Sequence, residues 1–214
     1  MPLGARTGFF LVGGRVSVAP LVEASGLEKR YGRKRALRPL DLTVERNGFL
    51  VLTGANGSGK TTLLRLVAGL AAPTRGTLEV RADRRELGYL GHEALVYRDL
   101  TALENLDFYG RLYRVAERRE RIGMLLERFG LWEARGERAS AYSRGMLQRL
   151  ALCRALLHDP ALLVLDEPFT ALDDEGAGLL DRQLAELRGE RTVLLSTHDP
   201  ARVERLATAR LALM

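Results

Sequence analysis

The sequence predicts an α/β fold, and two observations carry that prediction. Short apolar runs at 49–53, 87–90, 162–165 and 192–196 have the length of buried strands, and longer amphipathic stretches separate them. A glycine-rich loop at 54–59 joins the first run to a helical stretch, in the order strand, loop, helix. Because strands covered on both faces read as continuous apolar runs, we expect a mainly parallel sheet with helices packed on it.

The composition is that of one globular domain, and it excludes several classes of protein. The chain has 214 residues, of which 46% are hydrophobic and 28% charged. No apolar stretch approaches the roughly 20 residues that span a bilayer, and Cys153, the single cysteine, excludes an internal disulfide. The net charge of +6 comes from cations interspersed with acids. A solvated surface explains this charge at least as well as an anionic partner, and we expect no nucleic-acid partner.

Residues 1–20 are predicted to form a loose tail. They carry several Pro and Gly residues and show neither helical nor strand periodicity. Ordered periodicity begins at Leu21, so we expect residues 21–214 to form a single domain. The apolar run 9–12 is too brief for a secretory signal, which makes a cytoplasmic location the expectation.

The middle of the chain differs from the rest because it shows helical patterns and no convincing strand. Thr101 and Glu104 have the spacing of a capping box, which predicts a helix running to about Tyr113. We therefore expect a helical subdomain over about 93–157, inserted between two parts of the α/β core.

A phosphate-binding loop is predicted at 54–61, which reads G-A-N-G-S-G-K-T. The glycines let successive backbone N–H groups turn toward a β-phosphate, and the helix N-terminus adds the positive end of its dipole. Lys60 reaches the β- and γ-phosphate oxygens, and the Thr61 hydroxyl can ligate Mg²⁺. ATP and Mg²⁺ are therefore the expected cofactors. The candidate residues are Gly54, Ala55, Asn56, Gly57, Ser58, Gly59, Lys60, Thr61 and Thr62.

Two consecutive carboxylates follow a predicted strand. Asp166 comes directly after the apolar run 162–165, where a carboxylate can hold the magnesium's water shell. Glu167 then projects toward the γ-phosphate and is the candidate general base that polarises the attacking water. The alternative for Glu167 is an ordinary loop carboxylate.

A family resemblance begins at residues 142–149, Y-S-R-G-M-L-Q-R. This segment resembles the Leu-Ser-Gly-Gly-Gln signature loop of the ATP-binding subunits of ATP-binding-cassette (ABC) transporters. Ser143 and Gly145 match that pattern, whereas Arg144 and Met146 depart from it. The resemblance implies that Ser143 and Gly145 face the nucleotide of a second copy in an ATP-bound dimer. Read without it, Ser143 is the N-cap of a helix with a core face at Met146, Leu150, Cys153 and Leu157, and both roles can hold together.

The resemblance covers residues 22 to about 205, and it implies further structure and site residues. The implied fold is a P-loop NTPase core with a mainly parallel sheet, an antiparallel β edge and the inserted helical subdomain. Asp173 resembles the loop residue that crosses the dimer seam, and His198 the switch histidine that contacts the γ-phosphate alongside Glu167 and Lys60. Tyr31 sits where the family stacks an aromatic ring on adenine, although as an isolated residue it would more often be surface packing.

Residues 88–93 and 100–106 are similar to the Q-loop region of haem-exporter ATPases of the cytochrome c maturation system. There His92 takes the place of the usual glutamine, and its imidazole can coordinate Mg²⁺ only when neutral. The resemblance implies haem export. The signature at 142–146 is equally at home in exporters of drugs and polysaccharides, which leaves a general export ATPase as the alternative. Both imply membrane-spanning partner subunits at the cytoplasmic face of the membrane.

A soluble ABC ATPase that does not transport is the remaining alternative. Members that act on DNA carry long coiled-coil or zinc insertions, whereas this chain has only a short segment between His92 and the signature, without a heptad run. Translation-type members usually join two cassettes, and this chain has one. Transport is therefore the favoured hypothesis.

Overall fold

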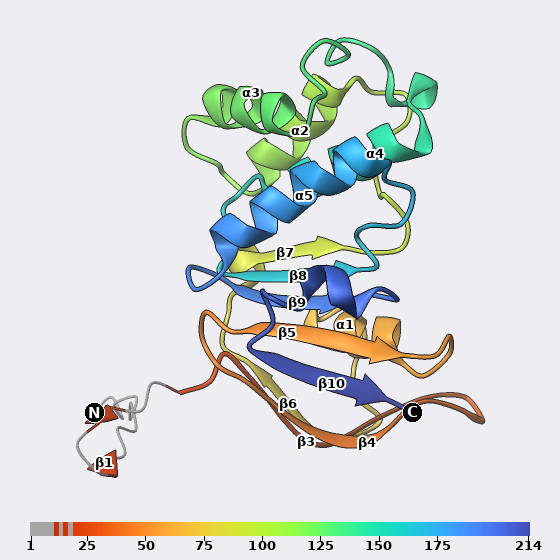
Figure 1. The fold of residues 1–214 in the computed structure, drawn as a ribbon, viewed down its shortest axis with the longest axis vertical. Helices are drawn as coiled ribbons and strands as arrows, with labels where there is room; N and C mark the ends of the chain where they lie inside the picture. Colours follow the sequence, from red (N-terminus) through yellow and green to blue (C-terminus); the bar gives the residue numbers. More distant parts are fainter. Residues whose placement is uncertain (1–10, 13–14, 17–18) are drawn as a thin grey trace, which may run out of the picture.

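The computed structural model describes residues 11–12, 15–16 and 19–214, and residues 19–214 form two sheets with helices between and beyond them (Figure 1). The main sheet has the strand order β10-β5-β9-β8-β7, and every neighbouring pair is parallel. The second sheet is antiparallel, with the order β4-β3-β6. The main-sheet strands are β5 (Phe49–Gly54), β7 (Leu87–Leu90), β8 (Leu162–Asp166), β9 (Thr192–Ser196) and β10 (Ala209–Leu213); the others are β3 (Val22–Tyr31), β4 (Lys34–Val44) and β6 (Arg75–Val80).

The predicted tail, residues 1–20, lies largely outside the described residues. Its described part includes two short strands, β1 (Leu11–Val12) and β2 (Arg15–Val16), which pair antiparallel. Looseness of this segment therefore stays a prediction.

The central strands of the main sheet are buried on both faces, and their side chains alternate between two apolar cores. In β5, Leu50 and Leu52 belong to one core while Phe49 and Val51 belong to the other. The first core lies between the two sheets and includes α1 (Lys60–Val67); the second lies under α4 (Arg144–Leu156) and α5 (Asp174–Leu187). A strand packed on both sides reads as a continuous apolar run, which is why the sequence predicted β5, β7, β8 and β9. The edge strand β10 is largely exposed, and the sequence did not predict it.

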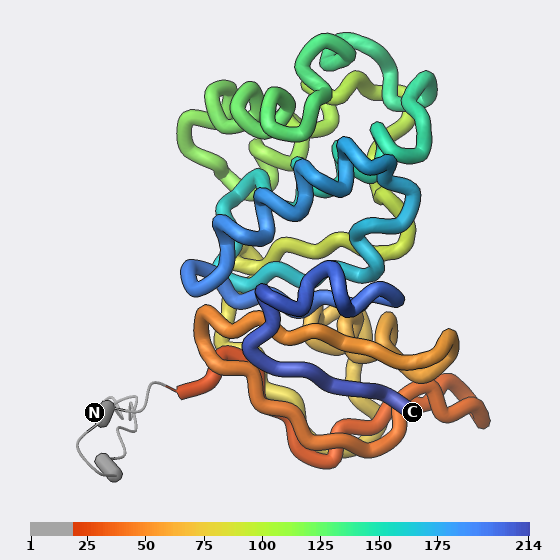
Figure 2. The backbone as a smooth tube through the Cα atoms, in the orientation of Figure 1, coloured from red at the N-terminus to blue at the C-terminus, as the bar shows by residue number. Residues whose placement is uncertain are grey.

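A helical insertion separates β7 from β8. Figure 2 shows the chain leaving the main sheet, winding through helices at one end of the molecule and returning. The first helix starts at the predicted capping box: the Thr101 Oγ1 atom accepts from the Glu104 N–H at 3.1 Å, and the Glu104 carboxylate accepts from the Thr101 N–H at 2.8 Å. The insertion contains α2 (Ala102–Leu112), α3 (Arg118–Arg128), the short 3-10 helix η2 (Ala139–Ala141) and α4.

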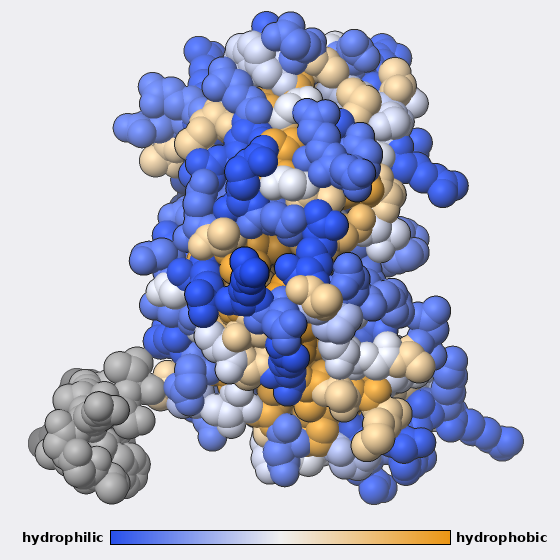
Figure 3. All heavy atoms as spheres, viewed as in Figure 1, coloured by the Kyte–Doolittle hydropathy of each residue, from blue (hydrophilic) through white to orange (hydrophobic). Residues whose placement is uncertain are grey.

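The exterior is largely polar on the face seen in Figure 3, where apolar side chains surface only in patches between charged ones. Among the described residues, no helix has both the length and the apolar character needed to cross a membrane. Two further 3-10 helices, η1 (Arg84–Glu86) and η3 (Pro200–Val203), complete the elements. The observed architecture confirms the predicted α/β class with a parallel sheet, an antiparallel β sheet and inserted helices.

Candidate functional site

The candidate site is a cleft at the carboxyl ends of the parallel strands. Strands β5, β9 and β8 are neighbours in the sheet, so the loops that follow them emerge side by side. The cleft collects residues from all three of these loops, from the hairpin of β3 and β4, and from the loop after β7. They are Lys34, Ala36, Ala55, Asn56, Gly57, Gly59, Lys60, Thr61, Thr62, His92, Asp166, Glu167, Thr170 and His198.

The glycine loop has backbone angles that ordinary residues rarely adopt. Gly57 and Gly59 have φ values of 83° and 107°. A Cβ atom at Gly59 would lie 2.7 Å from the carbonyl oxygen of Ala36, so no side chain fits there. Gly59 is also the N-cap of α1, and no side chain caps this helix. The first N–H groups of α1 are therefore available to an anion in the cleft.

Lys60 lies across the inside of the loop. Its side chain is 7% exposed, and its Nζ atom donates to the carbonyl oxygen of Gly54 at 2.7 Å. The same Nζ atom is 3.8 Å from Oε1 of Glu167. Thr61 and Thr62 follow at the start of α1 and line the cleft. Of the predicted phosphate-loop residues, all but Gly54 and Ser58 line this cleft.

Asp166 is buried at the end of β8 and is only 1% exposed. Its Oδ1 atom accepts from the Ser196 hydroxyl at 2.6 Å, whereas its Oδ2 atom has no hydrogen-bond partner among the described residues. A buried carboxylate oxygen needs a cation or a donor to offset the loss of water. Carboxylate and hydroxyl oxygens are the ligands that Mg²⁺ prefers, and Asp166 and Thr61 both line the cleft. The residues present therefore fit a magnesium ion.

Glu167 turns the chain sharply after β8. Its φ value is 49°, in the left-handed region, and its N–H donates to the Ser196 Oγ atom at 2.9 Å. Its carboxylate meets His198: Oε2 accepts from the His198 N–H at 3.1 Å, and Oε1 is 3.2 Å from the His198 Nε2 atom. The structure thus brings together three residues that lie apart in the sequence, Lys60, Glu167 and His198.

The other candidate residues lie at different distances from this cleft. His92 is exposed in the loop after β7 and lines the same cleft. Tyr31 ends β3 with 49% of its surface exposed, and the Lys29 Nζ atom lies 4.9 Å from its ring centre. The Tyr31 ring is not part of the cleft lining, although Lys34 and Ala36 of the same hairpin are.

Three candidates are engaged at helix starts. The Ser143 Oγ atom accepts from the Met146 N–H at 3.2 Å and caps α4, in whose first turn Gly145 lies. The Asp173 Oδ1 atom accepts from the Gly176 N–H at 2.9 Å and caps α5. None of the three residues lines the cleft of its own chain.

Sequence reasoning missed several residues of the cleft. Lys34, Ala36 and Thr170 line it, and Ser196 at the end of β9 bonds the Asp166 carboxylate and the Glu167 backbone N–H. Lys34 and Ala36 carried no motif. Ser196 had one usable signal, because it ends a predicted strand that neighbours the strand of Asp166.

Comparisons with known proteins show the family to which the chain is related. A protein-family model described as ABC transporter matches residues 37–170. The chain is 42% identical over 184 residues to the uncharacterized ABC transporter ATP-binding protein YxlF of Bacillus subtilis (strain 168), covering 83% of this chain and 62% of that protein. It is 39% identical over 198 residues to the daunorubicin resistance ATP-binding protein DrrA3 of Streptomyces coeruleorubidus, covering 87% and 63%. The chain thus spans somewhat less than two thirds of the length of these relatives.

A solved structure supports the same assignment. The ATP-binding cassette MJ0796, determined as a dimer in a post-hydrolysis state bound to ADP and Pi, superposes with a TM-score of 0.81 and 28% sequence identity. The match covers 90% of this chain and 94% of that one. With the family model spanning more than half of the sequence and the phosphate loop, Asp166 and Glu167 gathered in one cleft, the chain belongs to the ABC transporter family.

Proposed function

We propose that this chain binds Mg²⁺-ATP and hydrolyses it as the ATP-binding subunit of an ABC exporter. One observation carries the proposal: a single cleft holds an uncapped helix start with an inward lysine, a buried aspartate with one free oxygen, and a glutamate beside a histidine. These are the groups that phosphoryl transfer to water requires.

Each residue has a chemical role in the proposed reaction. Lys60 and the first N–H groups of α1 bind the phosphates, and Thr61 and Asp166 hold the magnesium ion. The bound ion would neutralise charge on the phosphate oxygens. Glu167 takes the proton from a water molecule as the water oxygen attacks the γ-phosphorus, and the bond from that phosphorus to the ADP oxygen breaks. His198 orients the Glu167 carboxylate and faces the same phosphoryl group.

Adenine binding is proposed for the hairpin of β3 and β4. Tyr31 is the aromatic ring at its tip, and Lys34 and Ala36 bring the hairpin to the edge of the cleft. About half of the surface of Tyr31 is exposed, so a base can stack on its ring. His92 also lines the cleft, and we propose that it is a ligand of the magnesium ion or of its water.

A second copy of the chain is proposed to complete the site. Ser143 and Gly145 form an anion-binding helix start at α4 but do not line their own chain's cleft. The dimeric arrangement of the cassette MJ0796 supports this proposal. Asp173 begins α5 and is proposed to lie at the seam between the copies.

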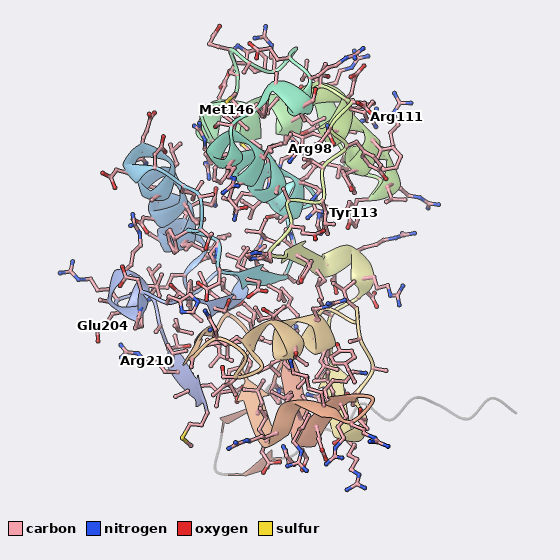
Figure 4. All side chains as sticks on the ribbon, turned by 90° about the vertical axis from the view of Figure 1, so that its right-hand side faces the viewer. Arg98, Arg111, Tyr113, Met146, Glu204 and Arg210 are labelled. Atoms are coloured by element: carbon pink, nitrogen blue, oxygen red, sulfur yellow. The ribbon has the colours of Figure 1, made fainter. Side chains whose placement is uncertain are left out.

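A membrane-spanning subunit is the proposed partner, and a groove between the helical insertion and the core supports it. Exposed leucines line this groove: Leu70, Leu95 and Leu112 are 53%, 50% and 64% exposed. Tyr113, which Figure 4 places where the insertion meets the core, stacks on His158 at a ring distance of 4.1 Å. Large exposed apolar residues gathered in a groove are typical of a protein-binding surface. Three arginines also line this groove: Arg84, Arg85 and Arg154.

The cargo is proposed to be a drug-like or other small organic molecule. The similarity to a daunorubicin resistance protein supports general export. Haem export, implied by His92 and the Q-loop region, is therefore the second candidate. The proposed location is the cytoplasmic face of the membrane, where the partner subunit would hold a chain whose described helices do not span it.

The test is ATP hydrolysis by the purified chain, with and without Mg²⁺. We expect Mg²⁺-dependent release of phosphate, and loss of both nucleotide binding and turnover in Lys60→Ala. Absence of hydrolysis by the wild type, alone and together with its membrane subunit, would overturn the enzymatic assignment. An active chain that co-purifies with no membrane protein from cell extracts would favour a soluble ABC ATPase.

A further inference from the structure

We propose that Ser196 is a positioning residue whose one hydroxyl group sets both the carboxylate of Asp166 and the backbone of Glu167. This inference rests on the proposed ATP hydrolysis. Ser196 ends β9 and is 0% exposed, so its hydroxyl reaches neither solvent nor substrate. It lies directly opposite Asp166 in the parallel pairing of β8 and β9.

The hydrogen-bond directions at this hydroxyl are unambiguous. A serine hydroxyl has one proton to donate and lone pairs to accept with. The Ser196 Oγ atom donates to Asp166 Oδ1 at 2.6 Å, because a carboxylate oxygen can only accept. It accepts from the Glu167 N–H at 2.9 Å, because a backbone N–H can only donate. One hydroxyl thus bonds the candidate metal ligand and the candidate base at the same time.

The bond to Asp166 decides which of its oxygens is free. With Oδ1 held by Ser196, the carboxylate cannot rotate without breaking a buried, charge-assisted hydrogen bond. Its Oδ2 atom, which has no partner among the residues that the structure describes, is then the oxygen left for a cation. Ser196 therefore orients the metal-side acid.

The bond to Glu167 holds an unusual backbone conformation. The φ value of 49° is rare for a residue with a side chain, and the Ser196 Oγ atom gives its N–H a partner in that conformation. Two residues later on the same strand end, the His198 N–H holds the Glu167 carboxylate at 3.1 Å. Ser196 at the end of β9 and His198 just after it therefore hold Glu167 by its backbone and by its carboxylate.

A variant pair isolates this hydroxyl. Ser196→Thr keeps the Oγ atom and Ser196→Val replaces it with a methyl group of similar shape, so both carry the same added bulk and differ only in the hydrogen bonds. Ser196→Ala removes the hydroxyl without added bulk. Thr192→Val is the matched control, because Thr192 is also buried on β9, at the strand's other end, where its hydroxyl accepts from the Asn47 N–H at 2.8 Å.

We expect Ser196→Ala and Ser196→Val to lower kcat about tenfold or more while KM for ATP changes less than about threefold, because ground-state nucleotide contacts remain. Ser196→Thr should restore most of the rate, and Thr192→Val should leave it unchanged. The Glu167 amide should exchange with solvent faster in the Ala and Val variants, and more Mg²⁺ should be needed to support ADP binding. Amide exchange and ADP binding do not depend on turnover, so they test Ser196 even if the chain does not hydrolyse ATP. Equal rates in the Thr and Val variants of an active enzyme, or unchanged exchange of the Glu167 amide, would overturn the proposal.

Discussion

Replacing Glu167 with glutamine separates ATP binding from ATP hydrolysis at this site. Glutamine keeps the size of the side chain and an oxygen that can accept from the His198 N–H, which Glu167 now bonds at 3.1 Å. It cannot take a proton from water. A general base contributes about 10²- to 10⁴-fold to a rate, which corresponds to about 3–5 kcal/mol of activation free energy. We therefore expect kcat to fall by about two to four orders of magnitude in Glu167→Gln.

Nucleotide binding should survive the same change. The Lys60 Nζ atom lies 3.8 Å from Glu167 Oε1, and both side chains are largely buried, so loss of the carboxylate leaves the ammonium free for the ATP phosphates. Phosphate release at saturating ATP measures turnover, and gel filtration with ATP should show a stable dimer. Glu204→Gln is the control, because Glu204 pairs with Arg210 at 2.7 Å near β10, away from the cleft (Figure 4). Turnover within about threefold of wild type in Glu167→Gln would refute the assignment of the base.

Three further outcomes follow from the site and its surroundings. Mixing inactive Lys60→Ala with inactive Ser143→Arg should restore activity, because one composite site in the mixed dimer keeps both residues; inactivity despite confirmed mixed dimers would count against shared sites. Leu112→Asp should abolish co-purification with the membrane subunit and spare basal hydrolysis, whereas Leu103→Asp, on the same helix and outside the groove, should change neither. Cys153 should resist alkylation at pH 8 until denaturant is added, because the thiol is fully buried and burial raises its pKa; rapid labelling of the native chain would contradict this.

Four strands of the main sheet and the phosphate loop were predictable because their signals are local, whereas the edge strand β10 was missed. The run 162–165 is an example: its strand is packed on both faces, so all of its residues are apolar. The capping box at Thr101 and Glu104 is equally local, and the helix it predicted ends within a residue of the expected Tyr113. Local patterns therefore placed both carboxylates and the lysine on the correct elements.

The antiparallel sheet was not readable from residue patterns alone. Strand β3 has register irregularities along its pairing with β4, which break the simple alternation of buried and exposed positions. It also buries a charge: Glu28 is 3% exposed, and its carboxylate accepts from Arg30 at 2.7 Å and from Arg35 at 3.1 Å. Only the family resemblance predicted this sheet. Glu28 thus pairs with Arg30 on its own strand and with Arg35 across the hairpin.

Ser196 shows a different limit of sequence reasoning. A serine at a strand end carries no motif, and its importance depends on the register that sets it opposite Asp166. The sequence predicted both strands, but the strand order that makes β8 and β9 neighbours is a tertiary fact. Groups that act directly on a ligand leave a motif, whereas a group that acts through them is found only when the strands are aligned.

The candidate residues divide according to the elements that carry them, and this division bears on the proposed dimer. Asp166, Glu167 and His198 follow the ends of parallel strands, which all meet at one edge, so a single chain can assemble them. Ser143 instead begins a helix, where its Oγ atom already accepts from the Met146 N–H. Accepting one hydrogen bond leaves the serine proton available to donate, and an anion such as a γ-phosphate is the acceptor that a helix start favours. Because Ser143 does not line its own cleft, we propose that the acceptor of this proton is a nucleotide bound by a second copy.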